Sequence, residues 1–175
     1  MQSWGQVLAE LASNRLMSLK RHAFLLCGDE SQAEDLVQDA LVRAYGRPLR
    51  AHRPGAAEAY VRVNMTRLFI DGARRRTRWQ RRAPLLQDTA HAVDPADQVL
   101  DRDLLLTAMN GLSSQQRACV VLRYYQDLPL TQVASELGLA EGAVKRYLSE
   151  AMTRLAGRLS PAASGDRGRV EPDRS

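Results

Sequence analysis

Apolar residues recur every three or four positions along most of this chain, which is the spacing of an α-helix that buries one face. The first such run covers residues 4–26, where the spaced residues include Leu16, Leu19, Ala23 and Leu26. Gly28 and Asp29 interrupt the pattern. The run therefore predicts a first helix that ends shortly before Gly28.

A second predicted helix begins at Ser31, because Glu34 follows three residues later in the arrangement of a capping box. Its buried stripe consists of Ala33, Leu36, Val37, Ala40, Leu41 and Ala44. The opposite face carries Asp35, Gln38, Asp39 and Val42. An acidic face with an exposed valine is a candidate surface for another protein, and an ordinary solvated helix face is an equally good interpretation.

A basic loop is predicted at residues 47–55, because they hold two prolines, a glycine and three arginines. A third helix is expected from about residue 56 to about residue 76, with the buried stripe Ala57, Val61, Met65, Leu68 and Gly72. Its other face alternates apolar side chains with arginines, at Val63, Arg67, Ile70 and Arg74. Either another helix covers Val63 and Ile70, or these side chains contact something flat and anionic.

The third helix runs into a segment in which six arginines surround Trp79, between Arg74 and Arg82. Arginines neutralise phosphates, and an exposed indole can stack on a base. The sequence favours a simpler role for Trp79, as an anchor that packs against the first or the third helix.

The chain loses its periodic pattern at residues 83–93, which we expect to be a linker. Asp94 and Pro95 then have the arrangement of an N-cap and a first helical residue. The helix that they open carries the apolar residues Val99, Leu100, Leu104, Ala108 and Leu112. A second capping box at residues 113–116 opens another helix, whose apolar residues are Ala118, Val121, Leu122 and Tyr125.

Residues 128–155 have the pattern of a helix-turn-helix. The apolar positions match the contacts that such a unit buries, at Val133, Ala134, Leu137, Leu139, Val144 and Leu148. Gly138 suits the left-handed conformation that ends the first helix of the pair. The second helix is then able to lie in the major groove of DNA. An ordinary helical hairpin is the alternative, and the fit at six spaced positions favours the DNA-binding unit.

These elements predict an all-α fold of two small helical domains, 1–82 and 94–160, joined by the flexible linker 83–93. The C-terminal domain contains the helix-turn-helix. Residues 161–175 are polar and rich in small residues, so we expect a disordered tail.

The formal charge of +5 is distributed unevenly along the chain. Between residues 47 and 82 eleven arginines stand against Glu58 and Asp71, whereas the segments on either side are net acidic. Scattered solubilising charge would be mixed in sign. The segregation therefore predicts a polyanionic partner for the middle of the chain.

Two cysteines, Cys27 and Cys119, form no C-x-x-C pair and have no histidine at ligand spacing. We expect buried thiols in a reducing compartment and no metal site. No apolar run approaches the length of a membrane span, and the N-terminus lacks the apolar region of a signal peptide. The expected protein is soluble and cytoplasmic, without membrane insertion.

Several segments, in order, resemble bacterial sigma factors of the extracytoplasmic-function (ECF) group of the sigma-70 superfamily, above all its actinobacterial sigma-E-like subgroup. The resemblance covers nearly all of residues 10–158. Its most specific motifs are AEDLVQDA and LPLTQVASELG. The full segments are GDESQAEDLVQDALVRAY, AYVRVNMTRLFIDGARRR, LSSQQRACVVLRYYQDLPLTQVASELG and EGAVKRYL.

The resemblance implies sigma region 2 in residues 1–82 and sigma region 4 in residues 94–160. Core RNA polymerase, through its β′ clamp helices and β subunit, would be bound by Asp35, Gln38, Asp39 and Val42. The −10 promoter element would be bound and melted by Arg62, Asn64, Arg67, Arg74, Arg75, Arg76 and Arg78. The −35 element would be recognised by Glu141, Gly142, Lys145, Arg146, Ser149 and Glu150.

The resemblance also implies that the linker threads toward the polymerase channels, where Asp88, Asp94 and Asp97 would mimic nucleic acid. An anti-sigma factor is a further partner that the family leaves open. The implied protein is a sigma factor, a non-catalytic subunit that needs no cofactor and gives RNA polymerase its promoter specificity.

Two other functions remain as alternatives at this point. A free-standing helix-turn-helix regulator would bind operator DNA as a dimer without polymerase. A nucleic-acid enzyme would need convergent carboxylates, a nucleophile–base pair or metal ligands. Asp35 and Asp39 lie one helical turn apart but far in sequence from the arginines, and the sequence shows no catalytic constellation.

Overall fold

The computed structural model describes residues 3–46, 54–82 and 100–159 of the 175-residue chain. The helices are α1 (Trp4–Cys27), α2 (Glu30–Gly46), α3 (Pro54–Arg82), α4 (Leu100–Met109), α5 (Ser114–Val120), the π-helix η1 (Val121–Tyr125), α6 (Leu130–Leu137) and α7 (Glu141–Leu159). No described residue lies in a β-strand, so the all-α prediction is confirmed. The predictions for the linker 83–93, for the Asp94–Pro95 helix start and for the tail 161–175 fall outside the described residues.

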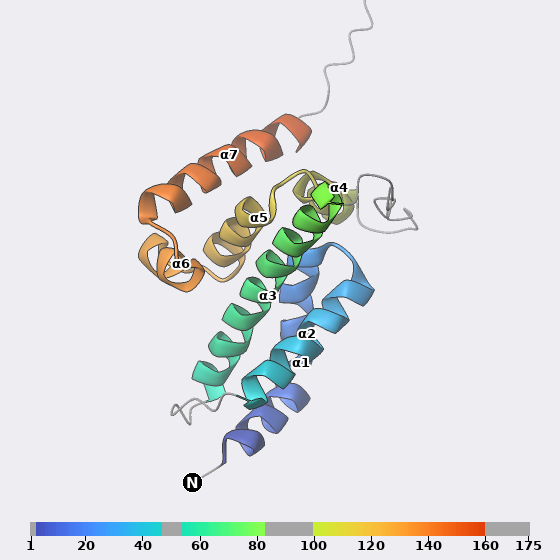
Figure 1. Ribbon diagram of the computed structural model, residues 1–175, viewed down its shortest axis with the longest axis vertical. Helices are drawn as coiled ribbons and strands as arrows, with labels where there is room; N and C mark the ends of the chain where they lie inside the picture. Colours follow the sequence, from blue (N-terminus) through green and yellow to red (C-terminus); the bar gives the residue numbers. More distant parts are fainter. Residues whose placement is uncertain (1–2, 47–53, 83–99, 160–175) are drawn as a thin grey trace, which may run out of the picture.

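The N-terminal unit consists of α1, α2 and α3, packed against one another (Figure 1). The expected stripe of α3 is its buried face, because Ala57, Val61 and Met65 are fully buried. Trp4 closes one end of this core and donates a hydrogen bond from its indole nitrogen to the Ala44 carbonyl, at 2.8 Å. At the other end Gly28 ends α1 with a φ of +75°, in the left-handed region that glycine adopts without strain.

The start of α2 differs from the prediction. The helix begins at Glu30, and its cap is Asp29, whose carboxylate accepts from the backbone N–H of Gln32 at 2.8 Å. The expected capping box at Ser31 was therefore wrong, since an aspartate two residues earlier already satisfies the free N–H groups of the first turn. Glu34 pairs instead with Lys20 of α1, at 2.6 Å.

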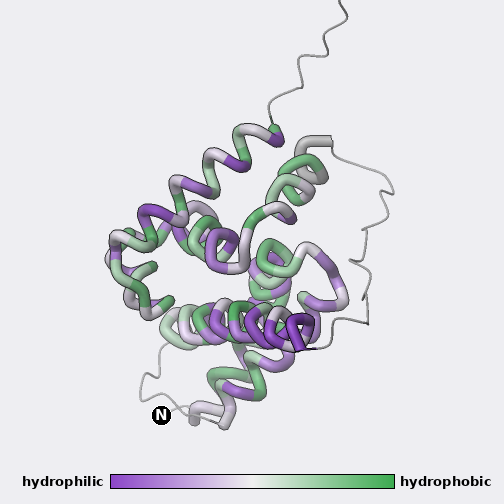
Figure 2. The backbone as a smooth tube through the Cα atoms, turned by 45° about the horizontal axis from the view of Figure 1, so that its top comes forward, coloured by the Kyte–Doolittle hydropathy of each residue, from purple (hydrophilic) through white to green (hydrophobic). Residues whose placement is uncertain are grey.

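The third helix is longer than predicted and continues to Arg82. Its last turns contain no glycine or proline, and arginine is a good helix former, so nothing ends the helix at residue 76. Figure 2 shows this end of α3 as strongly hydrophilic. Trp79 lies here with 56% of its surface exposed, so the prediction that it is a buried anchor was wrong.

The C-terminal unit is formed by α4 to α7 with η1. The predicted capping box is present at the start of α5, between Ser113 and Gln116. Gly138 ends α6 with a φ of +64°, as the helix-turn-helix pattern requires. Along α7 the side chains that face inward are Val144, Leu148, Ala151 and Leu155.

The two units are closed against each other along α3 (Figure 1). Helix α5 packs on α3 and α1, and η1 also touches α1. Ile70, on the face of α3 that alternates apolar residues with arginines, is only 5% exposed. The first of the two sequence interpretations is therefore confirmed for Ile70, because part of the C-terminal unit covers this face of α3.

Candidate nucleic-acid and protein interfaces

The acidic face predicted on α2 is open to solvent. Buried alanines and leucines hold the helix against α1 and α3, so Asp35, Gln38, Asp39 and Val42 all point outward. Val42 exposes 67% of its surface, and Tyr45, three residues further on, exposes 69%. Tyr45 was missed by the sequence analysis, although its spacing from Val42 places it on the same face. An exposed apolar pair beside two carboxylates is suited to a protein partner.

The arginines and the asparagine expected at the −10 element lie in different environments along α3. Arg62 is half-buried, and Asn64 is 8% exposed with a side-chain nitrogen that makes no hydrogen bond to the described residues. Arg67 is exposed, but its Nε donates to the Glu136 carbonyl at the end of α6, at 2.9 Å. All three side chains lie in the N-terminal half of α3. Asn64 is buried in the core, and Arg62 and Arg67 contact the C-terminal unit.

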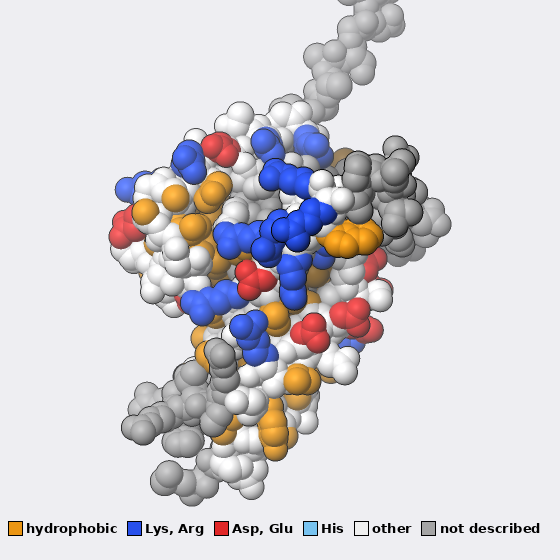
Figure 3. Space-filling model, in the orientation of Figure 1, with side chains coloured by type: hydrophobic (Ala, Val, Ile, Leu, Met, Phe, Trp, Pro, Cys, Tyr) orange, Lys and Arg blue, Asp and Glu red, His pale blue; other side chains and the backbone are white. Residues whose placement is uncertain are grey.

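The remaining four arginines of that set, Arg74, Arg75, Arg76 and Arg78, are exposed. Figure 3 shows Lys and Arg side chains gathered across the middle of one face of the molecule. Arg74 and Arg78 border a hollow that also reaches Ser114 of α5. This end of α3 can bind a polyanion without any change in conformation.

Arg75 and Arg76 point the other way, into a groove between α3 and α2. Asp35 and Asp39 line the same groove. The carboxylates are thus far from the arginines in sequence and close to them in space. A protein partner on α2 and a nucleic acid on α3 would therefore occupy neighbouring surfaces.

All six side chains or backbone positions expected at the −35 element are exposed on α7, at Glu141, Gly142, Lys145, Arg146, Ser149 and Glu150. Glu150 accepts a hydrogen bond from the side-chain nitrogen of Gln116, at 2.8 Å. Its other oxygen lies 3.8 Å from the Nε of Arg146. The sequence analysis missed Gln116 as a buried support for Glu150, because its capping-box role alone explained it from the sequence.

Within the described ranges, no three His, Cys, Asp or Glu side chains gather as a metal site would require. Burial raises the pKa of both thiols, Cys27 and Cys119, to about 11. The thiols are therefore protonated near neutral pH and poor nucleophiles. The same part of the chain contains no helix long and apolar enough to cross a bilayer.

Comparison with known families accounts for both units. The family described as Sigma-70 region 2 matches residues 13–79, and the family described as Sigma-70, region 4 matches residues 102–155. The RNA polymerase sigma-E factor of Streptomyces antibioticus is 35% identical over 159 residues, which cover 86% of this chain and 84% of that protein. The chain belongs to the ECF sigma factors. Its function is accordingly promoter-specific transcription initiation by RNA polymerase.

Other relatives agree with this assignment. The ECF RNA polymerase sigma factor SigL of Mycobacterium tuberculosis (strain H37Rv) is 33% identical over 142 residues, which cover 78% of this chain and 80% of SigL. Among solved structures, the sigma factor RpoE of Bartonella quintana, in complex with the anti-sigma factor NepR, is similar with a TM-score of 0.66 and 26% identity. That similarity covers 86% of this chain and 95% of the RpoE chain.

Proposed function

We propose that this sigma factor uses three separate surfaces, one on each of α2, α3 and α7. The exposed face of α2 binds core RNA polymerase, the arginine-rich end of α3 binds the −10 element, and the N-terminal half of α7 recognises the −35 element. The chain itself carries out no chemistry and acts in the cytoplasm as a regulatory subunit.

The observation that carries the proposal is that acidic and basic side chains gather on different helices of the chain. Asp35 and Asp39 project from one side of α2, and Arg75 and Arg76 of α3 line the same groove, whereas Arg74 and Arg78 face a separate hollow. A helix-turn-helix with an exposed second helix completes the chain. A subunit that lies between polymerase and DNA requires one surface for the polymerase and two for the DNA. The acidic face of α2 suits the first, and α3 and α7 suit the other two.

Transcription in vitro tests this function. The full chain is mixed with actinobacterial core RNA polymerase and a library of random-sequence duplexes, and transcript start sites are mapped. We expect transcripts only when all the components are present, from templates that share one sequence element near −10 and another near −35. Transcripts that begin at random positions, or that do not require the chain, would contradict the proposal.

The free-standing regulator makes a different prediction for the same components. Such a protein would select one duplex sequence tightly in the absence of polymerase. Sequencing of the duplexes that the chain retains with and without core enzyme separates the two functions. For the sigma factor we expect enrichment only with core enzyme present.

A further inference from the structure

A single hydrogen bond connects the buried start of α5 with the exposed face of α7. Gln116 is only 3% exposed, and its Nε2 donates to Oε2 of Glu150 at 2.8 Å. Both helices belong to the C-terminal unit and pack directly against each other. The bond therefore joins the core of this unit to the surface for which recognition of the −35 element is proposed.

The amide of Gln116 can adopt only one orientation at this position. Its Oε1 accepts from the backbone N–H of Ser113 at 3.1 Å, and this bond is half of the capping box at the start of α5. A flipped amide would direct its nitrogen at the Ser113 N–H and its oxygen at a carboxylate, so both contacts would become repulsive. The capping box thus determines that an N–H group of Gln116 faces Glu150.

Burial makes the bond between Gln116 and Glu150 difficult to break. A buried amide N–H that loses its acceptor cannot recover the hydrogen bonds that it would make to water. The acceptor is also a carboxylate, and hydrogen bonds to charged groups are stronger than those between neutral groups. Glu150 is therefore held at one oxygen, although its side chain is 47% exposed.

Glu150 passes this constraint to Arg146, which lies one helical turn earlier on α7. Its second oxygen, Oε1, lies 3.8 Å from Nε of Arg146. An exposed pair of this kind is ordinarily weak, because two long side chains must lose rotamer freedom to form it. Here Gln116 has already fixed one of the two partners, so less freedom remains to be lost.

Tyr147 restricts the Arg146 guanidinium from another direction. The Cζ atom of Arg146 lies 5.3 Å from the centre of the Tyr147 ring, within the range of a cation–π contact. A guanidinium that reads a base must be aligned with the base edge, because a bidentate contact uses two of its N–H groups at once. The sequence preference of Arg146 therefore depends on how firmly Glu150 and Tyr147 hold it.

The negative charge of Glu150 is a second reason why its position matters. DNA presents a row of phosphates, and a carboxylate that turned toward them would weaken binding. In the structure each oxygen of Glu150 faces a donor of the protein, at Gln116 and at Arg146. Gln116 thus keeps the carboxylate turned toward the C-terminal unit.

We propose that Gln116 is a positioning residue for −35 recognition, which fixes Glu150 and through it the guanidinium of Arg146. Gln116 lies in α5, before the helix-turn-helix, and is too deeply buried to touch DNA itself. The inference rests on the proposed function, because it requires that α7 recognises the −35 element. It places a determinant of promoter specificity outside the recognition helix.

The base preference near −35 is the measurement that tests this role. Core polymerase loaded with each variant selects duplexes from a library randomised at the −35 positions, and sequencing gives the preference at every base pair. Gln116→Met removes the donor and nearly keeps the volume of the side chain. We expect the preference to fall roughly five- to tenfold at the base pair that Arg146 contacts, within the discrimination that a bidentate contact provides, and to stay unchanged elsewhere.

Ser113→Ala is the matched control, because it breaks the other half of the same capping box and leaves the bond to Glu150 in place. Both variants should melt at a lower temperature by circular dichroism, whereas only Gln116→Met should change the base preference. Equal base preferences in the two variants would overturn the proposal, because Gln116 would then act only on the stability of α5.

An Arg146→Ala background shows whether Gln116 acts through Arg146. Side chains in one chain of contacts have non-additive effects. In that background Gln116→Met should therefore cause no further change in base preference. A further loss of five- to tenfold would contradict the connection from Gln116 to Arg146.

If Gln116→Met does not fold, Glu150→Ala provides the same test at an exposed position. It should relax the preference at the same base pair, and a Glu150→Ala chain that keeps the full preference overturns the proposal.

The unaltered chain separates this inference from the proposed function. If it selects no element near −35 with core enzyme present, the function proposed for α7 fails, and the positioning role of Gln116 fails with it. If it selects such an element and Gln116→Met selects the same element equally well, only the positioning role fails.

Discussion

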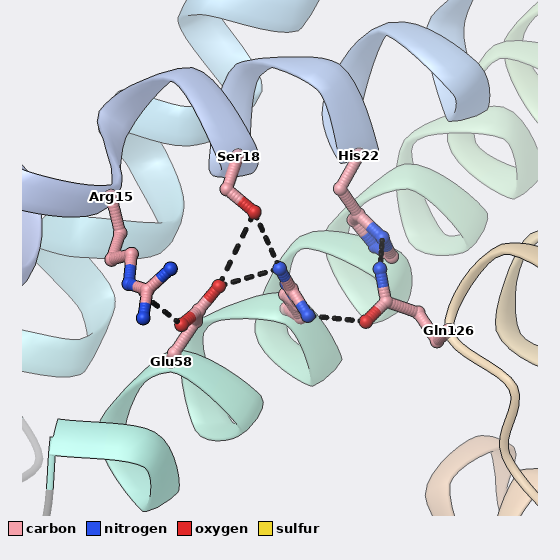
Figure 4. A network of polar contacts seen from close by, with 6 residues as sticks. Arg15, Ser18, His22, Glu58 and Gln126 are labelled. Atoms are coloured by element: carbon pink, nitrogen blue, oxygen red, sulfur yellow. Dashed lines mark hydrogen bonds and ion pairs between the residues drawn. The ribbon is translucent and has the colours of Figure 1, made fainter.

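His22 shows how one buried side chain makes the stability of the fold dependent on pH. Burial, and secondarily the charge of Arg62, lowers its pKa to about 3. The groups that face it are Arg62 and Thr66 from α3, and Tyr125 and Gln126 from η1 and the turn after it. None of them accepts a hydrogen bond from Nδ1 of a cationic imidazole, because the group at that atom is the N–H donor of Gln126 (Figure 4).

The free energy of unfolding should therefore fall in acid. An unfolded histidine titrates near pH 6.5, so below that pH the unfolded chain binds a proton that the folded chain excludes. The contribution of His22 is complete above pH 6.5 and decreases as the pH falls toward 3. Between pH 7.5 and 5.5 we expect a loss of about 1.4 kcal/mol in urea titrations. In the His22→Asn variant this part of the pH dependence should disappear, and an unchanged slope would contradict the assignment.

On α7, a chain of contacts orients Arg146. One carboxylate oxygen of Glu150 accepts a hydrogen bond from Gln116, and the other carboxylate oxygen faces Nε of Arg146. The two terminal nitrogens of the Arg146 guanidinium therefore remain available. That arrangement suits a guanine, whose two acceptors take a bidentate arginine.

Arg146→Ala should reduce affinity for the preferred −35 sequence by roughly 1–3 kcal/mol and relax the preference at one base pair. Lys145→Ala is the comparison, at the neighbouring exposed position. Affinities of the polymerase complex for templates mutated through the −35 element provide the measurement. An equal loss on every template would mean that Arg146 contacts only phosphate.

Most of the helical elements follow from periodicity alone. The stripe Ala57–Val61–Met65 and the inward row Val144–Leu148–Ala151–Leu155 were predictable, because burial requires one apolar face on each helix. The ends were less predictable. Asp29 and Ser31 are both good caps, and the apolar periodicity does not choose between them. The length of α3 was underestimated because residues 77–82 contain one apolar side chain, Trp79, and so show no periodic stripe.

The exposed face of α2 was predictable in the same way, as the complement of its buried stripe. Reversing its charge with Asp35→Arg and Asp39→Arg should abolish binding to core RNA polymerase while the circular dichroism spectrum stays unchanged. Surface plasmon resonance on immobilised core enzyme measures the effect. Glu34→Arg is the control, because it reverses a carboxylate of the same helix that points toward Lys20, and it should bind normally. Unchanged affinity of the double variant would exclude this face.

At the scale of the whole molecule, the contact between the units could not be predicted. It depends on Gln126, Arg117 and Arg67, single polar side chains that belong to no periodic pattern. Asn64 illustrates the same point, because the spacing that places it near the arginines also places it in the core. All three candidate surfaces were predicted from the sequence. Only the structure shows that the C-terminal unit covers part of the one on α3.

The C-terminal unit covers part of α3. The most direct test therefore compares the affinity of the protein for core RNA polymerase with its affinity for promoter DNA alone. An anisotropy titration of a dye-labelled chain with core RNA polymerase, and separately with a promoter duplex selected in the transcription experiment, measures both affinities. We expect tight one-to-one binding to core enzyme and weak binding to the duplex alone. Tight, sequence-specific binding to the duplex without polymerase would contradict it.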